Sequence, residues 1–355
     1  MNQQTINIEK LKQSPMFQLS LGSKELFHSN FLYWLWQAEP QAAEQLLGSL
    51  LKQTVNHEGM ELYRERMHFD LCLMEKRNGR ILAVIENKVK SLPKMDQLDK
   101  YDKTILKHNK DENAIRLLLS LYHGNLLSHG RWECCDYEEY LEALKTIAPM
   151  VSKGYHSSVY DDYCQMVVAL TEFVDNWSNI NWTKPYAEII SGKEDNEYRE
   201  LRINDLRHKI IYSELSDDLK HRIICREENR NADGTYSMPN GVEINSAFTN
   251  SLGIVSAKTE VCKDYYLGIQ VQGNQYRHFI EWHDRQPNMN VIQTVLDKDP
   301  FFFSHFPHHN KKTCCYKPSF FYHYIKTDGM LTIDVINQME KDILYCIDIR
   351  KQHYQ

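Results

Sequence analysis

Two largely apolar runs separated by Asn78-Gly79 constrain the fold of this chain most strongly. The runs cover residues 69–73 and 81–85, and an Asn-Gly pair between two strand-like runs is the strongest short-range signal for a β-hairpin. The sequence therefore predicts two neighbouring antiparallel strands, joined by a turn in which Gly79 adopts the left-handed backbone conformation.

Charged residues mark the open end of this predicted hairpin. Asp70 lies at the start of the first run, and Glu86 and Lys88 follow the second. Side chains two positions apart on a strand point to the same face of the sheet. We therefore expect Glu86 and Lys88 to face one cleft while Asn87 turns away.

The length of the hairpin loop decides whether Asp70 joins this cleft. A two-residue loop would place Asp70 opposite Asn87, on the wrong face of the sheet. A three-residue loop of residues 77–79, with a bulge at Gly79, places Asp70 opposite Glu86. We predict the second register, because a shared site requires it.

Two carboxylates and an amine in this arrangement suit the hydrolysis of a phosphodiester. A hard cation such as Mg²⁺ takes carboxylate oxygens as ligands, polarises the phosphate and lowers the pKa of the attacking water. Asp70 and Glu86 would supply these oxygens, and Lys88 would steady the hydroxide or the phosphate charge. The simpler alternative is a pair of ordinary strand-end carboxylates beside a solvated lysine.

The pattern of an Asp followed by an apolar strand that ends in Glu-x-Lys resembles the PD-(D/E)xK nuclease superfamily, also called restriction-endonuclease-like. Residues 23–35 are similar to the opening helix of a bacterial branch of that superfamily. Gln97 and Tyr101 match the Gln-x-x-x-Tyr motif of its RecB-like members, and residues 113–122 resemble the next core strand. One departure is visible: Phe69 stands where the superfamily's name has Pro.

The resemblance implies an α/β fold, with a mixed central sheet flanked by helices, and a nuclease that depends on Mg²⁺ or Mn²⁺. It implies that Asp70, Glu86 and the backbone carbonyl of Asn87 bind the metal, and that Gln97 and Tyr101 position the substrate. DNA, rather than RNA, is the expected nucleic acid. Many bacterial relatives of this type belong to phage-defence or mobile-element systems, so that context is expected here as well.

Glu25 is the remaining candidate for catalysis and metal binding. It lies in a segment, residues 24–37, whose pattern predicts a helix, and it precedes His28 by one turn. Glu25 would add a third carboxylate to the metal cluster. The alternative is that the helix only covers the sheet, with Glu25 near its positive end. A lone histidine such as His28 more often fills a structural role.

Two other functions compete with this interpretation. One is zinc binding, suggested by a crowded set of residues: His305, His308, His309, Cys314 and Cys315. Adjacent cysteines do not easily occupy two tetrahedral positions, which argues against zinc. The other is a catalytically silent nuclease fold that binds nucleic acid or a protein partner. The intact pair of acids and the lysine argue against that rival.

Composition narrows the choice of partners and compartment. The net charge of −6 argues against a protein that coats nucleic acid indiscriminately, so we expect binding in a local groove. Nine cysteines, an odd number, predict no disulfide framework, and residues 1–14 lack the apolar core of a signal peptide. We therefore expect a cytoplasmic protein without membrane contact, and leave a homo-oligomer or a protein partner open.

The chain of 355 residues is long enough for two domains. We expect a nuclease domain over residues 1–180 and a C-terminal α+β accessory region over residues 181–355, which provides specificity or binds a partner. Within that region, residues 265–271 and 276–282 predict a hairpin that turns at Gly273-Asn274.

Overall fold

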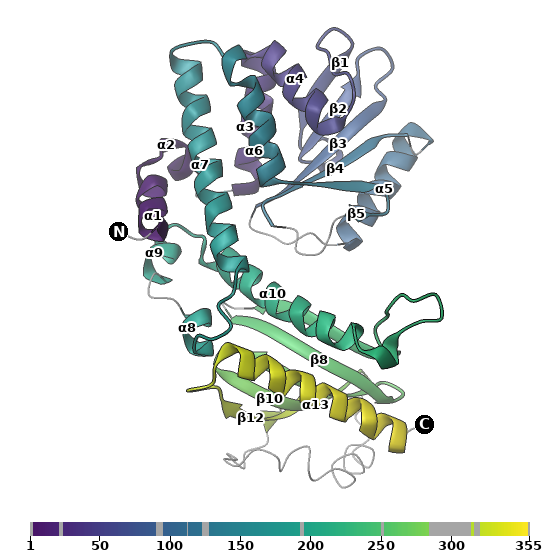
Figure 1. Cartoon of the computed structure of the whole chain (residues 1–355). Coiled ribbons are helices and arrows are strands. Elements are labelled where there is room, and N and C mark those ends of the chain that lie inside the picture. The colour runs from purple at the N-terminus through teal and green to yellow at the C-terminus, as the bar shows by residue number, and fades with distance from the viewer. Residues whose placement is uncertain are drawn as a thin grey trace. The chain divides into compact units, whose positions relative to one another are not determined.

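The computed structural model describes residues 3–20, 24–89, 95–111, 113–122, 128–191, 195–249, 252–283, 314–315 and 320–353 (Figure 1). The chain divides into two compact units, which we describe separately. The first unit consists of residues 1–177 and 196–207, and the second of residues 178–195 and 208–355.

The first unit is built on a mixed sheet. Its strands are β1 (Met60–Arg64), β2 (Leu71–Glu75), β3 (Ile81–Lys88), β4 (Ile115–Ser120), β5 (Ser128–His129) and β6 (Trp132–Asp136). They lie in the order β1-β2-β3-β4-β6-β5. The pairs β1–β2, β2–β3 and β5–β6 are antiparallel, whereas β3–β4 and β4–β6 are parallel. A parallel pair needs a crossover connection, and α5 (Met95–Asn109) provides it between β3 and β4.

Helices cover both faces of this sheet. Besides α5, the helices of this unit are α1 (Gln3–Gln13), α2 (Pro15–Ser20), α3 (Lys24–Ala38), α4 (Pro40–Leu51), α6 (Tyr137–Ile147), α7 (Tyr155–Ser178) and α9 (Asp195–Glu200), with short 3₁₀ turns at Arg66–His68 and Ala148–Met150. Figure 1 shows α3, α4 and α6 on one side of the sheet and α5 on the other. The predicted α/β fold, a mixed sheet flanked by helices, is confirmed.

Strand β3 is buried on both faces, which explains why its sequence is a continuous apolar run rather than an alternating one. Val84 packs into a core cluster with Leu98 and Ile105 of α5. The next-but-one residue, Glu86, therefore points toward α5. Asn87 turns to the opposite face, where its side chain donates a hydrogen bond to Ser29 of α3.

The turn of the β2–β3 hairpin differs from the prediction. It is a four-residue loop of residues 76–79, which the hydrogen bond from the Glu75 N–H to the Arg80 carbonyl closes at 2.9 Å. Gly79 has a φ of 72°, the left-handed conformation that the sequence predicts. The predicted three-residue loop of residues 77–79 is wrong.

A β-bulge nevertheless brings the hairpin into the predicted register. The pairing shifts between Leu73 and Met74, and beyond this point Leu71 pairs with Ile85. Continued by one residue, this register sets Asp70 opposite Glu86. The predicted parity of the hairpin is therefore confirmed, although the bulge lies inside the strands and not at the turn.

The second unit is built on an antiparallel sheet. Its strands are β7 (Val242–Thr249), β8 (Leu252–Cys262), β9 (Tyr265–Gln272), β10 (Gln275–Trp282), β11 (Cys314–Cys315) and β12 (Phe320–Lys326), and they lie in the order β11-β12-β10-β9-β8-β7. The predicted hairpin is β9–β10, in which Gln272 pairs with Gln275 across the turn. Its helices are α8 (Tyr186–Ile190), α13 (Thr332–His353) and the part of α10 (Asn204–Ile224) from residue 208 on, with a 3₁₀ turn at Glu227–Asn229.

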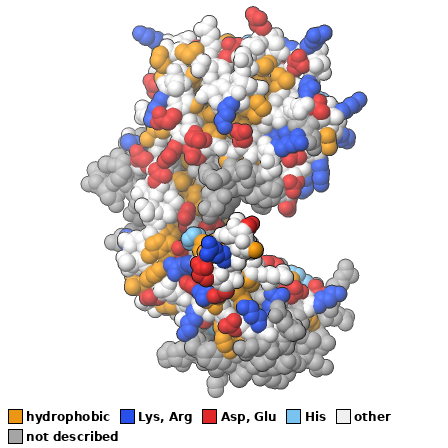
Figure 2. Space-filling view, turned by 45° about the vertical axis from the view of Figure 1, so that its right-hand side comes forward, with side chains coloured by type: hydrophobic (Ala, Val, Ile, Leu, Met, Phe, Trp, Pro, Cys, Tyr) orange, Lys and Arg blue, Asp and Glu red, His pale blue; other side chains and the backbone are white. Residues whose placement is uncertain are grey.

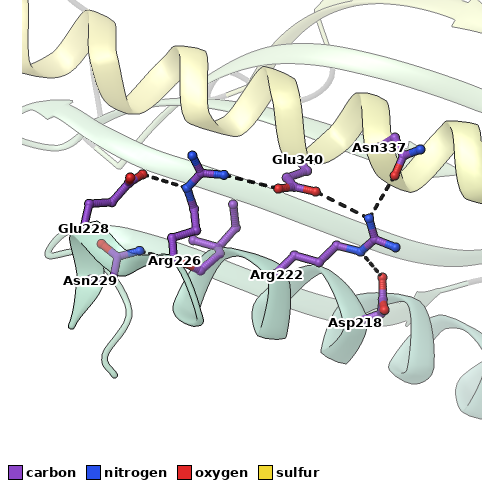
Figure 3. Close-up of polar contacts among 8 residues, drawn as sticks. Asp218, Arg222, Arg226, Glu228, Asn229, Asn337 and Glu340 are labelled. Carbon is purple, nitrogen blue, oxygen red and sulfur yellow. Dashed lines mark hydrogen bonds and ion pairs between the residues drawn. The ribbon is translucent and has the colours of Figure 1, made fainter. Parts of the chain in front are cut away.

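Polar contacts hold α10 and α13 side by side in the second unit (Figure 3). Arg222 of α10 donates to Asn337 at 2.9 Å and to Glu340 at 3.4 Å, both on α13. Arg226, which follows α10, reaches the other carboxylate oxygen of Glu340 at 3.4 Å. These side chains are partly exposed, so the contacts align the helices more than they stabilise the unit.

A buried polar network anchors α13 to the sheet. The Asp342 carboxylate, 5% exposed, accepts hydrogen bonds from Tyr276 (2.9 Å) and from His278 (2.8 Å) of β10. Gln338, one turn earlier on α13, donates to the other oxygen of Asp342 at 2.8 Å. A buried carboxylate is tolerated here because each of these donors compensates its lost hydration.

Candidate functional site

The site lies at the open end of the β2–β3 hairpin. Asp70 stands directly before β2, opposite Glu86, and its carboxylate accepts a hydrogen bond from the backbone N–H of Asn87 at 2.7 Å. Asp70 is partly buried, whereas Glu86 and Lys88 are 2% and 6% exposed. Solvent therefore reaches the site on the Asp70 side more easily than at the other two residues.

Glu86 is the centre of a hydrogen-bonded cluster. Its Oε1 atom accepts from Lys88 Nζ at 2.7 Å, from Gln97 Nε2 at 2.8 Å and from the Tyr101 hydroxyl at 3.4 Å. Gln97 Nε2 also donates to the Tyr101 hydroxyl at 2.7 Å. Lys88 reaches Glu86 because residues two apart on a strand share a face, and Gln97 and Tyr101 meet it together because they are one helical turn apart.

Tyr101 keeps its proton in this environment. Burial raises its pKa above the ordinary value, and the negative charges of Glu86 and Asp70 raise it further, although the hydrogen bond from Gln97 acts in the opposite direction. Both carboxylates thus act on the same hydroxyl. Tyr101 is a hydrogen-bond donor to the site and not a base.

Phe69 packs against the ring of Tyr101 and so supports the site. It is 1% exposed, and its ring lies 5.1 Å from the Tyr101 ring, which in turn lies 6.0 Å from the Trp132 ring. All three belong to or pack against the core cluster between the sheet and α5. Phe69, which stands where the superfamily's name has Pro, therefore holds in place the tyrosine that contacts Glu86.

Of the remaining candidate residues, the structure describes only the side chain of His28. Glu25 lies in α3, but its side chain is outside the described residues. His28 is buried, and its Nδ1 atom is 2.8 Å from the Tyr163 hydroxyl, within a cluster of aromatic rings. His28 thus has the structural role expected of a lone histidine. The side chains of the zinc alternative, those of His305, His308, His309, Cys314 and Cys315, are also outside the described residues.

The donor set of the site fits a hard divalent cation. Asp70 and Glu86 contribute carboxylate oxygens, which Mg²⁺ and Mn²⁺ prefer, and Mg²⁺ is commonly bound through one or two carboxylates while it keeps several waters. Among the side chains that the structure describes, no group of three or more His, Cys, Asp or Glu residues is gathered for metal binding. Among the described side chains, the site therefore offers two carboxylate ligands, and two are sufficient for Mg²⁺.

Sequence reasoning missed two arginines beside the site. Arg64 ends β1, and Arg66 lies in the turn that leads to Asp70. Both follow Tyr63 within four residues, and this mixture of aromatic and basic residues is the signal that could have singled them out.

The mixed sheet and flanking helices of the first unit are consistent with a restriction-endonuclease-like fold. Residues 16–165 match a sequence model of the PD-(D/E)XK nuclease superfamily, and this segment contains Asp70, the Glu-x-Lys pair, Gln97 and Tyr101. The predicted resemblance is confirmed at the level of the superfamily, and nuclease activity is what this superfamily implies. No curated protein and no solved structure matches the chain. Within the described residues, none of the helices is both long and apolar enough to span a membrane.

Proposed function

We propose that the first unit is a nuclease that hydrolyses phosphodiester bonds in DNA and depends on Mg²⁺ or Mn²⁺. One observation carries the proposal: a buried Glu86 carboxylate bonded to Lys88, Gln97 and Tyr101, with Asp70 in register across the hairpin. Asp70, Glu86 and the backbone carbonyl of Asn87 would hold the cation, and Glu25 would add a further ligand. When bound, the cation polarises the scissile phosphate and lowers the pKa of a bound water.

The side chains around Glu86 divide the remaining work. Lys88 orients the attacking water and stabilises the negative charge that develops at phosphorus, because its ammonium group is already fixed at the Glu86 carboxylate. The protonated Tyr101 and the amide of Gln97 hold Glu86 in place and contribute donors to the substrate side. Preorganised donors of this kind need no rearrangement during the reaction, which is the main source of their effect.

Charge supports a local groove and not a broad nucleic-acid-binding surface. The chain carries a net charge of −6, and acidic and basic side chains are interspersed over the face drawn in Figure 2. Near the site, α5 carries the exposed lysines Lys100, Lys103 and Lys107, of which Lys100 is about one helical turn from Gln97. Such a local field favours the approach of phosphates.

The second unit, on this proposal, is an accessory region that provides specificity or binds a partner, and the protein works in a bacterial defence or mobile-element system. The preference for DNA, the RecB-like motif and this context follow from the resemblance of the sequence. Because the preference for DNA rests on this resemblance, the cleavage assay has to compare DNA with RNA.

The experiment is a cleavage assay with labelled single-stranded DNA, duplex DNA and RNA, in Mg²⁺, in Mn²⁺ and in EDTA. Glu86→Gln keeps the size of the side chain but removes its charge, and Glu138→Gln, at an exposed position on α6, is the matched control. We expect cleavage of DNA in either metal, no cleavage in EDTA, loss in Glu86→Gln and retention in Glu138→Gln. Cleavage that persists in EDTA or in Glu86→Gln would reject the proposal, and binding without cleavage would favour the silent rival.

A further inference from the structure

The turn between β1 and Asp70 is unusual in its backbone. Glu65, Met67 and His68 have φ values of 51°, 55° and 69°, a left-handed conformation that few residues other than glycine adopt. The turn is closed by hydrogen bonds from the Phe69 N–H to the Arg66 carbonyl (3.1 Å) and from the Glu65 N–H to the Asp70 carbonyl (3.2 Å). Backbone strain of this kind persists where the surroundings impose it, often next to functional sites.

This turn presents two arginines whose guanidinium groups are held in place by tyrosine rings. The Arg64 guanidinium lies 4.5 Å from the centre of the Tyr33 ring and donates a hydrogen bond to Asn30. The Arg66 guanidinium lies 4.3 Å from the centre of the Tyr63 ring. Stacking on a ring orders a guanidinium and leaves N–H groups at its edge to bind the oxygens of an anion.

Both arginines are exposed, and neither forms an ion pair with a carboxylate among the described residues. Other arginines of the same unit behave differently: Arg80 pairs with Asp111 at 2.9 Å, and Arg116 pairs with Asp102 at 2.6 Å. The charges of Arg64 and Arg66 are therefore available to an external anion.

A cavity lies beside Arg64, and Arg66 follows its lining residue Glu65 in the turn without being part of the lining. Its lining comes from α3 and from the end of β1, and consists of Leu26, Asn30, Tyr33, Tyr63, Arg64 and Glu65. Guanidinium groups next to tyrosine rings match the chemistry of a nucleotide, whose phosphate takes bidentate hydrogen bonds from arginine and whose base stacks on an aromatic ring. The Glu65 carboxylate on the same lining opposes an anion.

We propose that Arg64 and Arg66 form a phosphate-binding subsite for the substrate strand, adjacent to Asp70 and separate from the cluster around Glu86. This inference rests on the proposed function in one respect, the identification of the anion as a nucleic-acid phosphate. The subsite holds the backbone of the strand independently of base sequence, and so places the neighbouring phosphodiester at Asp70. Arg64 and Arg66 are positioning residues, and they take no part in the chemical step.

The test measures binding of a labelled single-stranded or duplex oligonucleotide by fluorescence anisotropy, with the full chain in EDTA so that no cleavage occurs. We expect the combined substitution Arg64→Met and Arg66→Met to weaken binding about tenfold or more. The slope of log affinity against log salt should fall by about 0.7–0.9 for each phosphate that the variant no longer neutralises. Arg77→Met, at an exposed arginine in the turn at the other end of the hairpin, is the matched control and should change neither quantity.

Two further variants sharpen the test. Glu65→Gln should strengthen binding, because it removes the negative charge from the lining of the cavity. Arg64→Lys combined with Arg66→Lys should restore most of the salt slope but only part of the affinity. Lysine keeps the charge but lacks the paired N–H donors of the guanidinium group. If the double Met variant shows a lowered unfolding temperature, Arg66→Met alone is used, because the Arg66 side chain forms no hydrogen bond with any of the described residues that the substitution would break.

Unchanged affinity and salt slope in the Arg variants, or an equal loss in Arg77→Met, would overturn the inference. Cleavage by the unmodified chain separates this result from the proposed function. Arginine-dependent binding without cleavage supports the phosphate subsite and rejects the nuclease. Cleavage with binding that ignores both arginines rejects the subsite alone, and a chain that neither cleaves nor binds rejects both.

Discussion

Two buried carboxylates, one in each unit, each accept hydrogen bonds from three side chains. The donors to Glu86 are Lys88, Gln97 and Tyr101, and the donors to Asp342 are Tyr276, His278 and Gln338. By burial and by the number of donors the two groups are alike. A list of buried, well-bonded acids therefore does not by itself distinguish a site of chemistry from an anchor.

The surroundings of the two acids differ. Glu86 stands opposite a second acid, the partly buried Asp70, at the open end of a hairpin. Asp342 is a residue of α13 that faces β10, and its hydrogen bonds join the helix to the sheet. A second acid within reach and a route to solvent are what a metal-assisted reaction requires, and an anchor requires neither.

The largest expected effect separates the two networks by activity. Lys88→Met removes the ammonium group at nearly constant volume and should lower the single-turnover cleavage rate about 10²–10³-fold, because one fixed charge at the reacting phosphate is removed. Lys145→Met, at an exposed lysine on α6, is the control and should cleave normally. If a Lys88→Met protein remains folded and cleaves at the unmodified rate, the network around Glu86 has a structural role and not a catalytic one.

The second effect separates the networks by stability. Asp342→Asn removes a charged acceptor that faces Tyr276 and His278, and should lower the free energy of unfolding of the second unit by about 1.5–3 kcal/mol. Hydrogen exchange of peptides from β10 and α13 would locate the loss. Glu340→Gln, on the same helix in the partly exposed network of Figure 3, should cost about 0.2–1 kcal/mol. Equal losses in the two variants would contradict the anchoring role of Asp342.

The smallest effect concerns a third buried carboxylate, Glu39, which lies in the first unit away from the site. Burial would raise its pKa, but hydrogen bonds from His156 and Ser152 outweigh burial and lower the pKa below the ordinary value of 4.5. The stability that Glu39 contributes is thus present at neutral pH and is lost as the pH falls through its lowered pKa. Glu39→Gln should cost about 1 kcal/mol at pH 7.

The measurement is the unfolding temperature of the unmodified chain and of Glu39→Gln over a series of pH values. We expect the difference between the two proteins to shrink as the pH falls below 4.5. A difference that stays constant or grows in acid would show that the Glu39 charge does not stabilise the first unit.

Short-range patterns predicted the elements of the site, whereas long-range contacts decided their details. The alternating direction of successive side chains on a strand predicted that Glu86 and Lys88 share a face. The hairpin turn was not predictable, because Asn109, at the end of α5, both donates to and accepts from the backbone of Ile81. Its partner is 28 positions away, and local turn preferences do not include such a contact.

The hydrogen-bond partners of Gln97 and Tyr101 could likewise not be predicted from the sequence. Their spacing predicts a common face of a helix, but not that this face meets Glu86 itself. His28 binds a tyrosine 135 positions away, which no local pattern shows. The arginine pair was missed because a basic residue at a strand end is usually a solvated one, and only the positions of Tyr33 and Tyr63 distinguish it.

The division of the chain into units that are not continuous in sequence bears on how the protein can be dissected. Residues 196–207 belong to the first unit, where the Tyr198 ring packs 5.7 Å from Phe173 and 5.5 Å from Trp177. A fragment that stops near residue 180 would leave these two aromatic side chains of α7 uncovered and prone to aggregation. A truncation meant to isolate the hydrolytic half should therefore keep the chain to residue 207, and loss of solubility in a shorter fragment would say nothing about catalysis.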